Sequence, residues 1–224
     1  MTSTSKRRNK RAWIISIIAI VALLIIAFII SRTEKTVDPA SFADVVTFDL
    51  GAHEKGNLDS QIRLIEYSDF QCPACKSAEP AVEDLVNTFG DQFVFEYRHY
   101  PLRSIHPNAQ KAAEASEAAA KQGKFWEMHD ILFARQNEWS QSFNPEKMFS
   151  SYAKEIGLNV DRFKYDLKSD EVKKVVNDSY NEAVSLNLPG TPSFVYDGKE
   201  IDFNDFINQH LDLSQFIQPE IIEE

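Results

Sequence analysis

Two cysteines separated by two residues, Cys72 and Cys75, are the only cysteines in the chain. They follow an apolar, strand-like run over residues 62–67 and precede a helix-like pattern. A disulfide between them would close so short a loop that it would remove only about 2 kcal/mol of chain entropy. A purely structural cross-link is therefore a weak explanation. Reversible thiol chemistry, placed where a strand leads into a helix, explains the pair better.

The N-terminal segment has the pattern of a membrane anchor. Residues 1–11 contain five basic side chains, and residues 12–30 carry no charge and consist mostly of Ile, Ala, Leu and Val. A helix of about 20 apolar residues crosses a bilayer, and its basic flank stays in the cytoplasm. We therefore predict a cytoplasmic segment over residues 1–11 and a single transmembrane helix over residues 12–31, embedded in membrane lipid. Everything beyond this helix is expected to lie outside the cytoplasm.

A cleaved signal peptide is the competing interpretation of the same segment. The apolar region of a signal peptide usually spans about 7 to 15 residues and ends in a small-x-small cleavage site. Residues 28–32 instead read Phe, Ile, Ile, Ser, Arg. Length and the missing site favour the uncleaved anchor. Both interpretations place the cysteines in a compartment where disulfides persist.

The rest of the chain is acidic and long enough for one domain. Without the five N-terminal basic residues it contains 19 basic and 34 acidic side chains, a net charge of −15. Such a charge argues against nucleic acid as a partner. We expect a polar tether over residues 32–45, one domain with a full hydrophobic core over residues 46–212, and an acidic tail over residues 213–224.

Hydrophobic periodicity predicts an α/β domain. Strands are expected at residues 62–67 and 93–97, joined by a helix over residues 72–89 that ends at Gly90. Asp197 and Gly198 mark the turn of a later hairpin. The other predicted elements are helices from Pro107 to Gly123 and over 124–136, 145–157, 161–167 and 170–186, hairpin strands at 193–196 and 199–201, and a last helix over 203–211.

The position of the cysteines at a helix N-terminus assigns them different roles. Unpaired backbone N–H groups and the positive end of the helix dipole favour an anion there. Cys72 is therefore expected to have a lowered pKa and to be the nucleophile. Cys75, one turn further in, is expected to be more buried and to be the resolving thiol. Pro73 suits the first helical turn, whereas Pro80 lies inside the helix and is expected to kink it.

The residues around this motif resemble a known family. Residues 65–71, which read Ile, Glu, Tyr, Ser, Asp, Phe, Gln and lead into the Cys72–Cys75 motif, are similar to the active-site strand and turn of DsbA-like thiol-disulfide oxidoreductases, within the thioredoxin superfamily. The resemblance implies a thioredoxin-like α/β fold with an inserted helical subdomain at about residues 105–186. It continues through residues 98–102, 106–109, 123–130 and 190–194.

The resemblance also implies an activity and its partners. The chain would be an extracytoplasmic enzyme of the cell membrane that catalyses disulfide formation in exported proteins with free thiols, by exchange with a Cys72–Cys75 disulfide. A DsbB-like integral membrane oxidase would reoxidise it and pass the electrons to quinone. No cofactor and no metal are expected, since the spacing of the five histidines indicates no metal site with the two thiols. Strongly oxidising relatives have His where this chain has Ala74, which leaves the strength of the oxidant open.

Three further residues acquire roles from the resemblance. Pro192 corresponds to the proline that is cis in thioredoxin-like proteins, which would let the backbone of Thr191 pair with an extended substrate segment. A trans proline in a turn is the alternative. Glu66 resembles a buried acid that exchanges a proton with Cys75, although strand alternation alone also allows it to face solvent. Asp69 is interpreted as a turn residue.

Three other functions remain open. A reductase or isomerase of the same fold would be kept reduced by a different membrane partner. A non-catalytic peptide-binding chaperone would keep its activity without the two cysteines. A copper-delivery protein would use the thiols as soft ligands, although the motif has no Met or His ligand beside them.

Overall fold

The computed structural model describes residues 20–23, 51 and 53–214. The chain divides into two units, Met1–Ala43 and Asp44–Glu224. The described residues of the first unit, 20–23, are helical and exposed. Among the described residues, no helix combines the length and the apolar character that a membrane crossing requires. The predicted cytoplasmic segment, the rest of the predicted anchor, the tether and most of the acidic tail lie outside the described residues.

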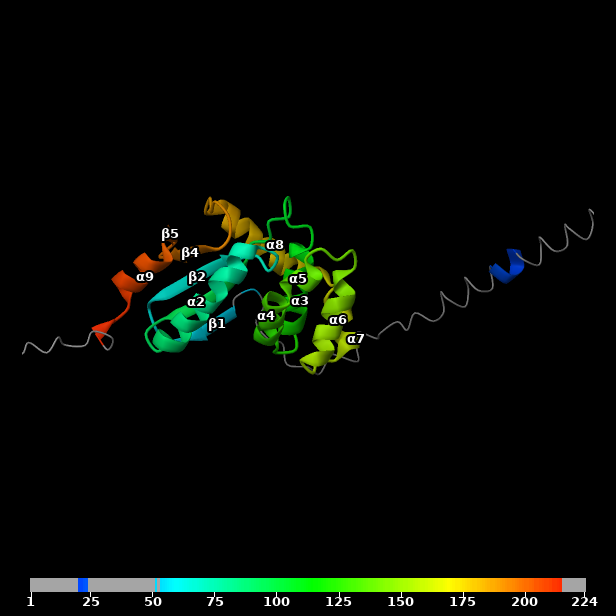
Figure 1. Cartoon of the computed structure of the whole chain (residues 1–224), viewed down its shortest axis with the longest axis horizontal. Helices are drawn as coiled ribbons and strands as arrows, with labels where there is room; N and C mark the ends of the chain where they lie inside the picture. Colours follow the sequence, from blue (N-terminus) through cyan, green and yellow to red (C-terminus); the bar gives the residue numbers. More distant parts are fainter. Residues whose placement is uncertain (1–19, 24–50, 52, 215–224) are drawn as a thin grey trace, which may run out of the picture. The chain divides into compact units, whose positions relative to one another are not determined.

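In the described part of the second unit, a five-stranded sheet has the order β1-β3-β2-β4-β5 (Figure 1). Strands β2 and β3 are parallel, and the other neighbouring pairs are antiparallel. Parallel neighbours need a crossover connection, and helix α2, Pro73–Phe89, provides it. The strands are His53–Gly56 (β1), Arg63–Ser68 (β2), Val94–His99 (β3), Ser193–Tyr196 (β4) and Lys199–Ile201 (β5).

The segment between β3 and β4 is helical, as predicted for the insertion. Figure 1 shows α3, α4, α6 and α7 grouped beside the sheet, with α9 near its other end. The remaining helices are Ala109–Ala120 (α3), Phe125–Ala134 (α4), Gln136–Trp139 (α5), Pro145–Glu155 (α6), Val160–Asp166 (α7), Asp170–Ser185 (α8) and Phe203–His210 (α9).

Helix α3 is the centre of the insertion because it packs against α4, α6, α7 and α8. Its buried positions are mostly alanine, and small side chains allow neighbouring helices to approach closely. Three fully buried aromatic side chains, Trp139, Phe149 and Phe163, belong to the core cluster that also includes alanines of α3. Large side chains of the surrounding helices therefore fill the space that the small side chains of α3 leave free.

Most predicted elements are confirmed, and the differences have local causes. The polar strand β1 was missed because its sequence, HEKG, lacks strand-like residues, yet it pairs with β3. The helix predicted from Pro107 begins at Ala109, and the one predicted over 124–136 is divided at Arg135, which has non-helical backbone angles. Pro80 does not end α2, which continues to Phe89. The predicted hairpin is formed by β4 and β5.

A buried polar cluster connects β1 and β3 to the insertion. His53 and His99 each place Nε2 2.8 Å from the same carboxylate oxygen, Oε1 of Glu117 in α3. Burial alone would raise the pKa of Glu117, but hydrogen bonds from the two imidazoles outweigh it and lower the pKa to about 2. The cluster therefore holds an ionised carboxylate in the interior.

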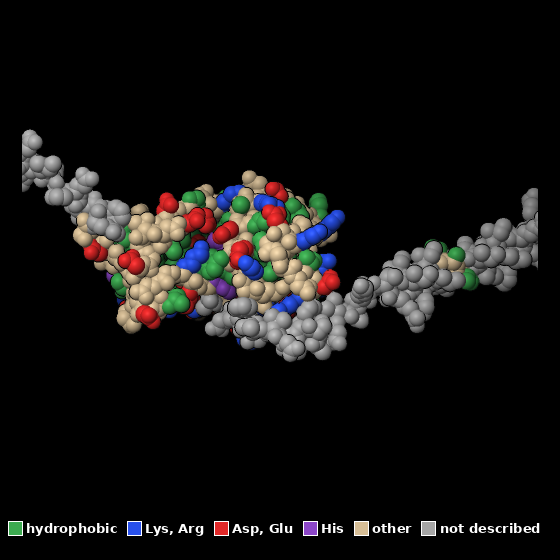
Figure 2. All heavy atoms as spheres, turned by 90° about the horizontal axis from the view of Figure 1, so that it is seen from below, with side chains coloured by type: hydrophobic (Ala, Val, Ile, Leu, Met, Phe, Trp, Pro, Cys, Tyr) green, Lys and Arg blue, Asp and Glu red, His purple; other side chains and the backbone are tan. Residues whose placement is uncertain are grey.

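One face of the second unit is mixed in charge. Acidic and basic side chains are interspersed over the face drawn in Figure 2. Ion pairs such as Lys124–Glu127 and Arg135–Glu155 join some of them. Pairs at the surface contribute little to stability, so the apolar core and the buried polar contacts hold this fold together.

Candidate active site

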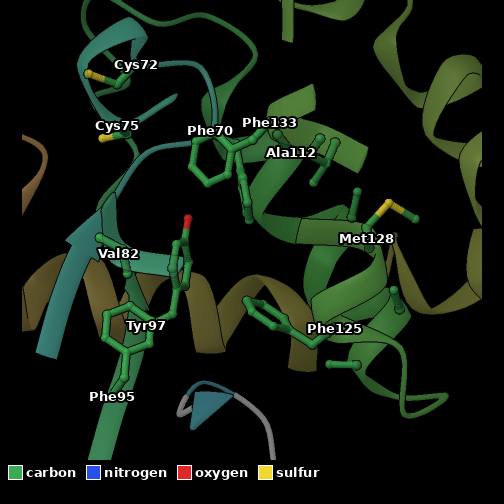
Figure 3. Packing of buried hydrophobic residues seen from close by; sticks show 14 of the residues in the cluster. Phe70, Cys72, Cys75, Val82, Phe95, Tyr97, Ala112, Phe125, Met128 and Phe133 are labelled. Atoms are coloured by element: carbon green, nitrogen blue, oxygen red, sulfur yellow. The ribbon is translucent and has the colours of Figure 1, made fainter. Parts of the chain in front are cut away.

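The two cysteines lie where β2 leads into α2. Cys72 is the N-cap residue, with extended backbone angles, and Pro73 is the first helical residue, where its missing N–H costs no hydrogen bond. Cys75 is 1% exposed and Cys72 is 6% exposed. Both are free thiols in the structure. Figure 3 shows them in the hydrophobic cluster that also includes Phe70 and Tyr97.

The buried side chain of Asp69 fixes the turn before Cys72. Its Oδ1 accepts a hydrogen bond from the backbone N–H of Gln71 at 2.7 Å. Its Oδ2 accepts another from the N–H of Leu102 at 2.9 Å and lies 2.7 Å from Nδ1 of His106. Asp69 thus acts as the turn residue that the sequence suggested, and it also holds the loop after β3 against the turn.

Two glutamine side chains attach the same turn to the helical insertion. Nε2 of Gln136, in α5, donates to the carbonyl oxygens of Phe70 at 2.8 Å and of Cys72 at 2.9 Å. Oε1 of Gln71 accepts from the N–H of Asn108 at 2.7 Å. The sequence analysis missed Gln136 because it lies 64 residues from Cys72 and carries no local signal. The rigidity of the active-site turn therefore depends on residues far away in sequence.

The loop that precedes β4 lies against Cys72. The Thr191–Pro192 peptide bond is cis, as the resemblance implied. The Cys72 thiol donates a hydrogen bond to the backbone carbonyl of Thr191, with 3.4 Å between sulfur and oxygen. The structure thereby brings the motif and the proline loop together across 119 residues of sequence.

The surroundings of Cys72 stabilise its thiolate. The largest cause is a hydrogen bond from the Cys75 thiol, which outweighs burial, and the Thr191 side chain and the backbone N–H groups of Cys75 and Ala74 add to it. Together they lower the pKa of Cys72 to about 5. Residue 74 takes part through its backbone, so a side chain between the cysteines is not needed for a thiolate at neutral pH.

Cys75 has the opposite character. Burial is the main cause that raises its pKa well above the usual value, followed by the hydrogen bond it gives to Cys72 and by the nearby charge of Glu66. Cys75 therefore holds its proton at neutral pH. Cys72 can therefore react as a thiolate at neutral pH, whereas Cys75 is protonated in the reduced protein.

Glu66 lies buried in β2, 5% exposed, so its side chain does not face solvent. Its strand neighbours in register are Tyr97 in β3 and Phe194 in β4. Burial is the largest cause that raises the pKa of Glu66 to about 7; the Ser68 hydroxyl opposes the shift and the charge of Glu79 adds to it. A carboxyl group with such a pKa can give and take a proton near neutral pH.

A small cavity adjoins Glu66. The cavity is about 10 Å³, near the smallest size that accommodates one water molecule. Its lining includes Glu66, the half-buried Glu79 and the exposed Glu83. The lining of this cavity thus includes three carboxyl groups of increasing exposure.

Comparison with known proteins identifies relatives of the domain. The family model described as Thioredoxin matches residues 50–216. A thioredoxin-like oxidoreductase from Silicibacter pomeroyi DSS-3 is similar in structure, with 27% sequence identity and a TM-score of 0.58 over 74% of this chain and 88% of that chain.

Two further solved structures share the fold at lower identity. BdbD from Bacillus subtilis is 20% identical, with a TM-score of 0.60 over 71% of this chain and 90% of that chain. The thiol-disulfide exchange protein alpha-DsbA2 from Wolbachia pipientis is 19% identical, with a TM-score of 0.58 over 75% and 90% of the two chains. The predicted thioredoxin-like fold is thus confirmed.

The chain is also similar to parts of longer proteins. Na(+)/H(+) antiporter NhaA 1 of Mycolicibacterium vanbaalenii is 39% identical over 150 residues, which is 65% of this chain and 23% of the antiporter. Na(+)/H(+) antiporter NhaA 3 of Salinispora tropica is 39% identical over 147 residues, which is 66% of this chain and 22% of the antiporter. This chain therefore spans less than a quarter of the length of these relatives.

The pKa of Cys72 can be tested by alkylation. In the reduced full chain, held in detergent micelles, Cys72 is expected to react with iodoacetamide with a midpoint near pH 5 instead of near 9.0, because the thiolate is the reactive form. Cys75→Ala removes the largest stabilising hydrogen bond and should raise the midpoint by about one unit or more. Cys75→Ser keeps a hydrogen-bond donor and should fall between the two. A midpoint above pH 8 in the unchanged chain, or no shift in Cys75→Ala, would contradict this account.

Proposed function

Because the chain belongs to the thioredoxin family, we propose that it is a thiol-disulfide oxidoreductase that forms disulfides in exported proteins. The observation that carries the proposal is the pair of thiols with opposed pKa values, with Cys72 lowered to about 5 and Cys75 raised. A relative named as a thioredoxin-like oxidoreductase supports the general class of reaction. The stabilised thiolate of Cys72 supports oxidation of the substrate as the direction of the reaction.

The proposed reaction starts from a Cys72–Cys75 disulfide. A substrate thiolate attacks Sγ of Cys72, the S–S bond breaks, and Cys75 leaves with the electron pair. A second substrate thiolate then attacks the substrate sulfur of the mixed disulfide, and Cys72 leaves as a thiolate. Two electrons have moved from the substrate to the enzyme. Of the two protons that the substrate thiols release, one ends on Cys75 and one in solvent.

Stabilisation of the Cys72 thiolate favours oxidation of the substrate. A thiolate of low pKa is a good leaving group, so the mixed disulfide resolves readily in favour of the substrate disulfide. The same stabilisation lowers the free energy of the reduced enzyme, which makes its disulfide a stronger oxidant. Backbone N–H groups, Thr191 and the Cys75 thiol support the thiolate where strongly oxidising relatives have a histidine.

Glu66 is the proposed proton donor to Cys75. As Cys75 leaves the disulfide, it becomes a buried thiolate beside a carboxyl group, which is costly unless it gains a proton. Glu66 has a pKa of about 7 and is therefore protonated in about half of the molecules at neutral pH. The cavity towards Glu79 allows Glu66 to regain its proton from solvent.

The backbone of Thr191 is the proposed substrate contact. Its carbonyl accepts a hydrogen bond from the Cys72 thiol. In the mixed disulfide Cys72 has no proton to donate, so this carbonyl is free to accept from a backbone N–H of an extended substrate segment. Such a contact does not depend on the side chains of the substrate. It suits an enzyme whose substrates are exported proteins of many sequences.

The proposed location and partners rest on the N-terminal sequence pattern and on the family resemblance. The uncharged residues 12–30 after a basic segment favour a single-pass membrane protein with a cytoplasmic N-terminus and an extracytoplasmic catalytic domain. A DsbB-like quinone-linked oxidase in the same membrane would restore the Cys72–Cys75 disulfide. The net negative charge of the domain argues against nucleic acid as a partner.

The proposed activity can be tested in a single turnover. The oxidised full chain in detergent micelles is expected to transfer one disulfide to a reduced peptide with two cysteines, detected by mass after acid quenching. The Cys72→Ala, Cys75→Ala variant is the control and should transfer none. Retention of the disulfide by the unchanged chain over hours would contradict the proposal.

The role of Glu66 predicts a distinct pH dependence. Donation to Cys75 requires protonated Glu66, so its contribution to the rate should be present below about pH 7 and lost above it. Glu66→Gln should slow the single turnover at pH 6 by about tenfold or more. In a plot of rate against pH, it should also remove the decrease in rate that has its midpoint near pH 7. The rates are corrected for ionisation of the substrate thiols.

Glu79→Gln is the matched control for this experiment. It keeps the buried acid but removes a charge that raises the pKa of Glu66, so the decrease in rate should persist and move to lower pH. An unchanged pH profile in Glu66→Gln would show that Glu66 has no part in proton transfer.

A further inference from the structure

The buried cluster of His53, His99 and Glu117 has the composition of a metal site. Its members come from three elements, β1, the last residue of β3 and the middle of α3. Their exposed fractions are 6%, 0% and 0%. One ligand atom from each side chain lies within 4.8 Å of the other two. The fold thus gathers two imidazole nitrogens and a carboxylate oxygen at one buried point.

The distances are close to those that one ion would impose. Nε2 of His53 and Nε2 of His99 each lie 2.8 Å from Oε1 of Glu117. Zinc bound tetrahedrally at about 2.0–2.1 Å from its ligands holds neighbouring ligand atoms roughly 3.3 Å apart. The side chains would need to separate by about half an ångström to admit the ion, which is a small rotamer adjustment rather than a rearrangement.

Within the part of the chain that the structure describes, two polar atoms of the cluster have no hydrogen-bond partner. They are Oε2 of Glu117 and Nδ1 of His99, and both are buried. Among the described residues, the ion-pair partners of Glu117 are the two histidines. The two imidazoles share one oxygen of this carboxylate and leave the other without a partner among the described residues, which is costly in the interior. A divalent cation would neutralise the carboxylate, and Oε2 would be available as an additional ligand.

The ligand types select the metal. Two imidazole nitrogens with one carboxylate match zinc and neighbouring transition-metal ions, whereas calcium and magnesium prefer all-oxygen sites. The two active-site thiols are not members of the cluster. A metal here would be structural, because its three ligands are buried and belong to the sheet and to the insertion.

We propose that His53, His99 and Glu117 bind one divalent transition-metal ion, with zinc as the best match, and that the ion fastens β1 and the end of β3 to helix α3. The sequence analysis expected no metal, because Glu117 lies 64 positions from His53 and 18 positions from His99 and no local spacing joins them. The proposal does not depend on the redox function, since it concerns a different set of side chains.

The test uses the full chain with Cys72→Ala and Cys75→Ala, so that no thiol competes for the metal. Isothermal titration calorimetry with zinc chloride, carried out in detergent micelles, is expected to show one ion bound per chain. A large excess of magnesium or calcium chloride should not displace it. Absence of zinc binding by this thiol-free chain would overturn the proposal.

Two variants in the thiol-free background locate the site. His53→Gln removes one ligand from the edge strand and should weaken zinc binding about 100-fold or more. His129→Gln is the matched control, because His129 is also buried but belongs to a different group, with Glu79 and Asp130. Binding that survives His53→Gln, or that disappears in His129→Gln, would place the metal elsewhere and overturn the proposal.

X-ray absorption of the zinc-loaded thiol-free chain tests the ligands without a change to them. Two imidazoles and at least one oxygen are expected in the coordination shell. A shell of oxygen ligands alone would contradict the assignment. This measurement decides the question even if His53→Gln fails to fold.

Discussion

The hydrogen bond from the Cys75 thiol to Cys72 is the interaction on which the proposed chemistry most depends. It is the largest cause of the low pKa of Cys72 and also contributes to the high pKa of Cys75. This contact therefore shifts the two pKa values in opposite directions, and burial is the larger cause of the high pKa of Cys75. It exists only while the turn keeps both residues in the first turn of α2, so the contacts that hold this turn are part of the chemistry.

Those contacts give the helical insertion a role at the active site. Gln136 from α5 binds two carbonyls of the turn, and Asn108, which precedes α3, binds Gln71. The same insertion contributes Glu117 to the buried cluster with the histidines of the sheet. The polar contacts between the insertion and the rest of the domain thus include one group beside the thiols and another that joins α3 to β1 and β3.

The features that could be predicted from the sequence are those determined by residues close together in the chain. The cysteine spacing, the first-turn proline and the Asp197–Gly198 turn are local signals, and the structure has the corresponding helix start and hairpin. The sequence did not decide which way Glu66 points, because alternation in a strand defines two faces and not which of them is buried. It also missed Gln136, β1 and the cluster around Glu117. Each of these depends on contacts between segments far apart in the chain, which leave no periodic or compositional trace.

The reduction potential of the Cys72–Cys75 pair tests the central claim most directly. The full chain would be equilibrated in glutathione buffers of known ratio, and its dithiol fraction would be read by alkylation and mass. The low pKa of Cys72 predicts a potential well above the thioredoxin value of about −270 mV, towards about −120 mV. A potential near or below about −270 mV would contradict an oxidase and indicate a reductase that receives electrons from a membrane partner.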